Sequence, residues 1–313
     1  MRGFHEKSPA ARELLETIGQ SFLAGYAYAA EARTPADAEE RLEGVPAQFR
    51  GFAYEGAAMA FAVRDGLPLG RGRNVATFLA GRAANHVYMV YVGVGWAMAR
   101  LPRFRWSRLY APDPLLRWLA LDGYGFHQAY FHTDRYVHGQ YREPRFPWPA
   151  DGPRWYADRA IDQGIGRAMW FVGGADADRV ATMIDKFAAH RRADLYSGAG
   201  LAATYAGGAD ADELLSFRQR AGEHGGQVAQ ASVFAATARV RAGLVTDHTR
   251  VATRALCGLT PEAVAQISDD LRPAAPGRLI PGRLAAPGRE TGIPAYEVWR
   301  QRLADQFVSL GRS

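Results

Sequence analysis

Apolar and small residues recur along the chain with helical spacing, and glycine stands at the centre of each repeat. The motif surrounds Gly25, Gly56, Gly95, Gly125, Gly166 and Gly200, and a degenerate copy surrounds Gln230. It returns about every 34 residues, which is the period of tetratricopeptide-like helix–turn–helix arrays. Because a glycine inside a helix costs about 1 kcal/mol relative to alanine, its recurrence predicts that neighbouring helices approach closely at these positions.

Capping residues and prolines place several boundaries. Ser8-Pro9 and Thr34-Pro35 each supply an N-cap followed by a first-turn proline. We therefore predict an all-α fold, an α-solenoid of about seven tetratricopeptide-like hairpins, over residues 1–271. A Pro/Gly/Arg linker follows at 272–293, and an apolar stripe predicts that 294–313 is a C-terminal capping helix packed back on the repeat domain.

Composition narrows the class of protein. The 313 residues are 48% hydrophobic, which is enough for a large core, and the net charge of +6 forms no dense basic stripe, so no nucleic-acid partner is expected. The uncharged run 87–99 is shorter than the roughly 18 residues of a membrane span. Cys257 is the single cysteine and no signal-peptide pattern opens the chain, so we expect a cytoplasmic protein without a membrane span.

Four Gly-x-Gly pairs resemble part of a nucleotide-binding loop. They begin at Gly93, Gly123, Gly164 and Gly198, and Asp113 follows the first at about the distance of a ribose-binding acid. A dinucleotide fingerprint occurs once, after a strand, whereas these pairs recur within apolar helical segments. Nucleotide binding through a Gly-x-Gly-x-x-Ala-type loop is therefore a second alternative, and no cofactor is expected.

A group of possible metal ligands comprises Asp122, His127, His132, Asp134 and His138. Only Asp134 and His138 have the i, i+4 spacing that places two ligands on one helical face, and no zinc-binding motif supports them. We expect polar helix-surface residues here and no bound metal.

One face of the motif helices is rich in aromatic residues. Positions three before and one, four or five after each glycine lie on the same side of a helix. On this face we predict an aromatic groove walled by Trp96, Phe126, Tyr130 and Trp170. A packed core is the equal alternative for the same pattern, since aromatic stripes at helical spacing usually pack inward.

Polar residues of the middle repeats are the candidates for chemistry. Gln163 and Arg167 are predicted to bind the ligand, and Asp122 to pair with Arg167 inside the groove. If the protein is an enzyme, Asp122 or His127 transfers the proton and Arg167 orients an anionic or carbonyl end. We expect a solvated pair, so that Arg167→Ala leaves thermal stability nearly unchanged.

Several segments also carry a resemblance to a known family. They are His86-Val-Tyr-Met-Val, Asp113-Pro-Leu-Leu-Arg-Trp-Leu-Ala-Leu-Asp-Gly-Tyr-Gly-Phe-His, Asp162-Gln-Gly-Ile-Gly-Arg, Arg192-Ala-Asp-Leu-Tyr-Ser-Gly-Ala-Gly-Leu and Pro294-Ala-Tyr-Glu-Val-Trp-Arg. These resemble the UnbL-type family, which is encoded in bacterial enediyne biosynthetic gene clusters. The likeness extends over about residues 49–300 and departs at 127–129 and 272–293. That family has no known function, so the resemblance implies a pathway, involving a hydrophobic polyene or its polyketide machinery, without a reaction.

The sequence thus predicts a secondary-metabolism protein that binds a hydrophobic conjugated small molecule in an aromatic-lined groove, with catalysis left open. The first alternative is a non-catalytic scaffold that docks a polyketide synthase, a carrier protein or another pathway partner. An enclosed pocket would favour the ligand, and an open, wetted groove would favour the scaffold.

Overall fold

The computed structural model describes residues 4–67, 73–144, 146–148, 153–273 and 292–308. All regular structure in these ranges is helical and none of it is strand, which confirms the all-α prediction. The elements are α1 (Pro9–Glu31), α2 (Pro35–Glu43), α3 (Ala47–Gly66), α4 (Asn74–Ala80), η1 (Arg82–His86), α5 (Val87–Met98), η2 (Arg103–Arg108), α6 (Trp118–Phe131), η3 (Asp134–His138), α7 (Arg154–Val172), α8 (Ala177–Ile184), α9 (Ala189–Ala206), α10 (Ala211–Arg220), η4 (Gly222–His224), α11 (Gly225–Arg241), α12 (Asp247–Cys257), α13 (Pro261–Leu271) and α14 (Ala295–Val308). No described helix is long and apolar enough to cross a bilayer.

The first two helices begin where their capping residues predict. Ser8 accepts a hydrogen bond from the backbone of Ala11, with Pro9 in the first turn of α1. At α2, Thr34 and Asp37 form a reciprocal capping box in which each side chain bonds the other's backbone amide. Both caps satisfy backbone donors that the first turn leaves without intrahelical partners.

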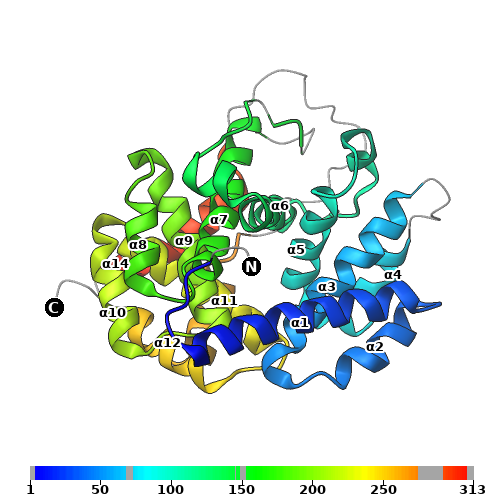
Figure 1. Ribbon diagram of the computed structural model, residues 1–313, viewed down its shortest axis with the longest axis horizontal. Coiled ribbons are helices and arrows are strands. Elements are labelled where there is room, and N and C mark those ends of the chain that lie inside the picture. Colours follow the sequence, from blue (N-terminus) through cyan, green and yellow to red (C-terminus); the bar gives the residue numbers. More distant parts are fainter. Residues whose placement is uncertain (1–3, 68–72, 145, 149–152, 274–291, 309–313) are drawn as a thin grey trace.

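The motif helices pack in succession. Helix α1 contacts α3, α3 contacts α5, α5 contacts α6, α6 contacts α7, α7 contacts α9, and α9 contacts α11. The shorter helices α2, α4, α8 and α10 lie towards the outer edges of the molecule (Figure 1). Aromatic residues of several motif helices belong to one hydrophobic cluster, among them Phe22, Trp96, Phe126, Phe171 and Phe234.

Glycine allows these neighbours to touch backbone to backbone. A Cβ added to Gly164 in α7 would lie 1.9 Å from the carbonyl oxygen of Asp122 in α6, and one on Gly198 in α9 would lie 1.8 Å from that of Gln163. Between α5 and α6 a Cβ on Gly95 would meet the carbonyl of Ala120 at the same 1.9 Å. Close approach, the predicted reason for the recurring glycines, is therefore confirmed.

Late helices of this series also contact early ones. Arg239 in α11 donates to the carbonyl of Gln48 in α3 at 2.9 Å, and Arg241 donates to that of Ala84 in η1 at 3.1 Å. The hydroxyl of Tyr205 in α9 lies 2.0 Å from where a Cβ on Gly51 would be. In an open solenoid each repeat touches only its neighbours. Here α9 and α11 also contact α3, so the helices are arranged around a common interior (Figure 1).

Helix α14 lies against α11 and α13. Its Trp299 indole donates to the carbonyl of Ser268 at 2.9 Å, and its Arg300 donates to Asp194 in α9 at 2.8 Å. The predicted linker at 272–293 lies almost wholly outside the described residues, as do residues 309–313 of the predicted capping helix.

Candidate functional site

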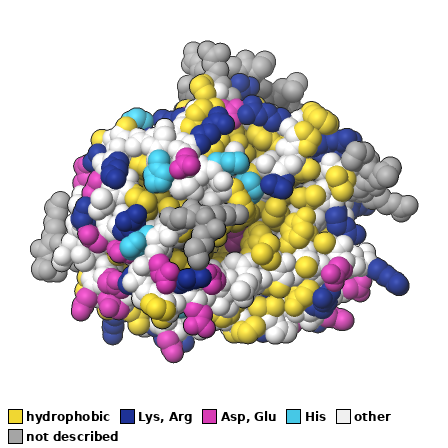
Figure 2. Space-filling view, viewed as in Figure 1, with side chains coloured by type: hydrophobic (Ala, Val, Ile, Leu, Met, Phe, Trp, Pro, Cys, Tyr) yellow, Lys and Arg dark blue, Asp and Glu magenta, His cyan; other side chains and the backbone are white. Residues whose placement is uncertain are grey.

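An apolar cavity of about 350 Å³ lies between α1, α3, α5, α6 and α7. Hydrophobic side chains gather above α1 on the face seen in Figure 2. Of the described residues that line the cavity, Glu55 and Arg167 are charged, and aromatic residues form most of the rest: Phe22, Phe52, Trp96, Phe126, Tyr130, Phe131 and Phe171. This volume, with apolar walls and few polar groups, is typical of small-molecule sites.

The aromatic wall is a set of interlocked rings from four helices. The Trp96 indole lies 4.5 Å from the Phe22 ring and 5.1 Å from the Phe126 ring, centroid to centroid. Phe126 stacks on Tyr130 one turn along α6 and meets Phe171 of α7 edge-on at 5.3 Å. Offset and edge-to-face pairs of this kind are favourable geometries that hold rings in place. The wall therefore presents flat apolar faces in fixed positions.

At the floor of the cavity, a chain of polar contacts crosses four helices. The Trp96 indole donates to Glu55 Oε1 at 2.9 Å, and Arg167 Nη2 lies 3.9 Å from that same oxygen. Arg167 Nη1 donates to Asp122, whose second oxygen accepts from the Gln163 amide at 2.7 Å. One buried arginine therefore serves two buried carboxylates.

Burial sets the charge of these groups. Removal from water raises the pKa of Glu55 to about 7 and Asp122 adds to that rise, whereas Arg167 and the Trp96 hydrogen bond oppose it. Burial lowers the pKa of Arg167, but the attraction of Asp122 and Glu55 outweighs burial and raises it above its ordinary value. At neutral pH the arginine is charged and Glu55 lies near the midpoint of its titration.

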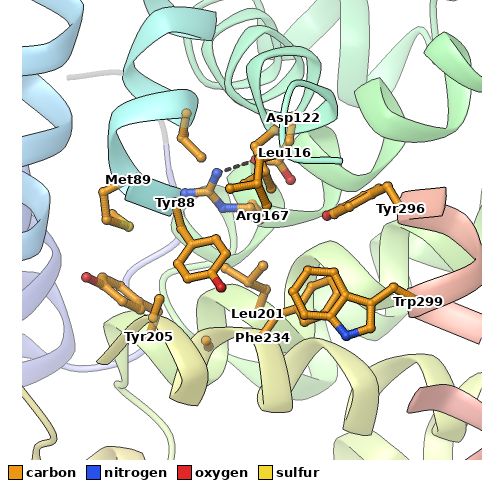
Figure 3. Close-up of a pocket in the computed structure, with 14 residues that line it drawn as sticks. Tyr88, Met89, Leu116, Asp122, Arg167, Leu201, Tyr205, Phe234, Tyr296 and Trp299 are labelled. Carbon is orange, nitrogen blue, oxygen red and sulfur yellow. Dashed lines mark hydrogen bonds and ion pairs between the residues drawn. The ribbon is translucent and has the colours of Figure 1, made fainter. Parts of the chain in front are cut away.

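Arg167 also borders a second, smaller void of about 40 Å³ at the centre of the helices. Figure 3 shows Arg167 and Asp122 facing each other there, with Tyr296 and Trp299 of α14 on one side and Tyr205 on the other. A cavity needs roughly 10–15 Å³ to hold one water molecule, so the void has room for a few waters. It is too small for an extended organic molecule, so the larger cavity is the candidate site.

Residues 1–307 match the family described as "Protein of unknown function (DUF1702)". The chain belongs to the DUF1702 family. No curated protein and no solved structure matches. Membership of a family of unknown function, which the sequence predicts, is thereby confirmed, and the match itself carries no link to enediyne biosynthesis.

The structure brings half of the predicted site residues of this DUF1702 chain to one cavity. Its lining includes Trp96, Phe126, Tyr130 and Arg167. Trp170 lies elsewhere, because its indole donates to the carbonyl of Gly207 at 2.9 Å and its ring packs near Phe217. Phe171 takes the predicted place on the wall, since adjacent residues of a helix point about 100° apart.

The other predicted site residues are buried beside the cavity. Asp122 borders the small central void. The Gln163 amide donates to Asp122 and, at 3.2 Å, to the Tyr296 hydroxyl. His127 packs edge-on against Trp96, with ring centroids 5.5 Å apart, and is not among the residues that line the cavity. The predicted proton donors therefore do not face the larger space.

Two expectations about this site change with the structure. Asp122 is 1% exposed and Arg167 is 6% exposed, so the pair is buried, and the solvated pair predicted from sequence is corrected. Helical periodicity does not single out Glu55, because it stands just before Gly56 and so lies outside the positions that define the inner face. A useful signal was present, since Glu55 is a lone charge within the small, apolar segment 51–62.

In the described part of the chain, no three His, Cys, Asp or Glu side chains are placed to hold a metal ion. His132, Asp134 and His138 are exposed, at and beyond the end of α6. The Gly-x-Gly pairs lie within α5, α6, α7 and α9, where the backbone amides bond the preceding helical turn. A phosphate-binding loop needs free amides after a strand, so these pairs do not support nucleotide binding.

Proposed function

We propose that the protein binds a hydrophobic, conjugated small molecule in the aromatic cavity, as part of enediyne or related polyketide-type secondary metabolism. The observation that carries this proposal is the 350 Å³ space walled by aromatic rings, with Glu55 and Arg167 at its floor. A planar conjugated chain gains from stacking on these rings and from leaving water, which is worth about 25 cal/mol per Å² of apolar surface. The pathway rests on the resemblance to the family of enediyne gene clusters.

The floor of the cavity also supports proton transfer on such a ligand. A general acid or base works best when its pKa is near the working pH, and burial brings Glu55 to about 7. The adjacent Arg167 is placed to stabilise negative charge that develops on a ligand oxygen. Glu55 therefore replaces Asp122 and His127 as the proton-transfer residue in an enzymatic version of this function.

A neutral fluorescent polyene, the methyl ester of cis-parinaric acid, tests the binding proposal. Gly19 in α1 lines the cavity and has nothing within 4 Å of an added Cβ, so Gly19→Trp should place an indole in the cavity mouth. The wild type should enhance the fluorescence of the ester, and Gly19→Trp should weaken binding by about tenfold or more, or about 1.4 kcal/mol. The matched control is Glu13→Trp at an exposed position on the same helix, which should bind like wild type. The proposal is wrong if the wild type does not bind the ester or if Gly19→Trp binds equally well.

A docking scaffold for a polyketide synthase or carrier protein is the second candidate. It is favoured by the apolar rim, where Leu23 is 65% exposed and Phe131 is 41% exposed. Leu23→Asp should then abolish capture of a polyketide-type acyl carrier protein while leaving ester binding intact. Loss of ester binding together with unchanged carrier capture would instead assign the rim to ligand entry.

A further inference from the structure

Arg167 is bonded on one side and has unused donors on the other. Its Nη1 donates to Asp122, but its Nε is buried and has no hydrogen-bond partner among the described residues. Its Nη2 is 3.9 Å from Glu55, beyond the 2.7–3.2 Å of N–H to O hydrogen bonds. A guanidinium carries five N–H donors in a planar fork that matches a carboxylate, and an unsatisfied buried donor is unfavourable. The side chain borders both the aromatic cavity and the small central void, so a head group at the floor of the cavity would meet a guanidinium that is not fully hydrogen-bonded.

We propose that the cavity takes an amphipathic carboxylic acid with a conjugated apolar chain, whose carboxylate binds Arg167 while Glu55 takes up a proton and becomes neutral. This inference rests on the proposed function, because it assigns the polar end of the same ligand. The chain lies along the aromatic wall and the head group lies at the floor. The one bond that forms is the O–H of Glu55, whose proton is given up by a solvent or buffer acid, and no bond of the ligand changes.

Charge balance requires the proton. With Glu55 ionised, Arg167 already faces two negative carboxylates, and a third in the same apolar space would be repelled by its like charge. Asp122 is held by both Arg167 and Gln163, so it is the less easily displaced acid. A neutral Glu55 can still accept the Trp96 hydrogen bond through its carbonyl oxygen and can offer its own O–H to the ligand.

Four groups on neighbouring helices act on the Glu55 carboxyl. Asp122 of α6 and Arg167 of α7 face it, and α5 supplies the Trp96 donor. Tyr205 of α9 is close enough to feel its charge, but burial raises the pKa of that hydroxyl above its ordinary value, so it stays neutral. From α1 the cavity receives apolar side chains, with Phe22 among them.

Fluorescence titration with cis-parinaric acid and its methyl ester between pH 6 and pH 9 separates the two ends of the ligand. The acid is ionised over this range, because an ordinary carboxyl titrates near 4. The wild-type Kd for the acid should rise about tenfold per pH unit above about pH 7, since each bound anion then requires one proton. The Kd for the ester should stay constant. Calorimetry in two buffers of different ionisation enthalpy should show one proton taken up per acid bound at pH 8, and it needs no variant.

Glu55→Gln should make acid binding tight and independent of pH, because the amide is neutral at every pH. The matched control is Glu16→Gln, which changes an exposed carboxylate of α1 that pairs with Arg12 and should keep the wild-type profile. Three results would each contradict the coupling of acid binding to protonation of Glu55. They are equal pH profiles for acid and ester, absence of proton uptake, and a pH dependence that survives in Glu55→Gln. Binding of the ester alone would leave the proposed function standing, whereas failure of both ligands to bind would end both proposals.

Discussion

Arg167 Nη2 lies 3.9 Å from Glu55 Oε1, close enough for electrostatic attraction but too far for a hydrogen bond. The same guanidinium donates directly to Asp122 through Nη1. Two buried acids thus share one cation unequally. Removing one acid should therefore have a different effect from removing the other.

The first prediction concerns the bonded acid. Asp122→Ala should lower the free energy of unfolding by about 3–5 kcal/mol, because Arg167 is left buried with its closest counter-charge removed. Glu55→Gln should cost much less at pH 7, since the carboxyl that it replaces is partly protonated there. Urea denaturation of both variants at pH 7 measures the difference. Glu262→Gln, at an exposed helix-start position, should stay within about 0.5 kcal/mol of wild type. Equal losses for Asp122→Ala and Glu55→Gln would contradict this unequal sharing.

The second prediction concerns stability against pH. The Glu55 carboxyl has an ordinary pKa of 4.5 and titrates at about 7 in the folded protein. Between these values the native state holds a proton that the unfolded chain has lost, so stability falls as pH rises from about 4.5 to about 7 and then levels off. Relative to wild type, Glu55→Gln should therefore gain up to about 3 kcal/mol across this window. Denaturation at pH 4.5, 6 and 8 measures that difference. A wild-type minus Glu55→Gln difference that is flat with pH would show that the carboxyl is not perturbed.

Helical periodicity predicts the parts of this site that lie near a repeated glycine. Trp96 and Phe126 follow their glycines by one residue, and Tyr130 is one turn beyond Phe126, so the 3.6-residue period places all three on the wall. The same rule includes both Trp170 and Phe171, and spacing alone cannot choose between neighbours near the edge of a face. The tertiary structure decides between them, because Trp170 packs near Phe217 of α10 and donates to the Gly207 carbonyl, which leaves Phe171 on the cavity wall.

The sequence predicts that the fold is all-α, but it does not predict that α11 packs back against α3. Local signals such as Ser8-Pro9 and the repeated glycines specify helices and close neighbours. The contact of Arg239 with Gln48 joins residues nearly 200 positions apart through a backbone carbonyl, which leaves no periodic trace in the sequence. Glu55 escaped prediction for a different reason, since it stands just before Gly56, outside the positions that define the inner face.

The third prediction compares two helical glycines. Gly164→Ala should reduce stability by more than about 3 kcal/mol or prevent folding, because its Cβ would lie 1.9 Å from the Asp122 carbonyl and force α6 and α7 apart. Gly19→Ala meets nothing within 4 Å and should raise stability by about 0.5–1 kcal/mol through helix propensity. Thermal denaturation of the pair gives the sign of each effect. If both glycines tolerate alanine equally, close backbone approach is not the reason for the repeat.

The last prediction concerns the contact that joins α11 to α3. Arg239 is 0% exposed, and its guanidinium donates to the carbonyls of Gln48 and Tyr205 at 2.9 and 2.6 Å. Burial lowers the pKa of this arginine, so its charge is already costly and the hydrogen bonds must offset that cost. Arg239→Met keeps the length and apolar stem but leaves both carbonyls without this donor. We expect a loss of about 2 kcal/mol, within the range of hydrogen bonds to charged groups.

Hydrogen exchange should locate the loss caused by Arg239→Met. Amides in the first turns of α3 and the last turns of α11 should exchange faster, while those at the α6–α7 crossing should be unchanged, because only the α3–α11 contact has been weakened. Arg241→Met is the matched control, since Arg241 is exposed and bonds the Ala84 carbonyl of η1 at 3.1 Å. Its effect should stay below about 0.5 kcal/mol, as for most surface substitutions. If Arg239→Met destabilises the protein no more than Arg241→Met does, the contact between α3 and α11 depends on packing around the small central void and not on the buried guanidinium.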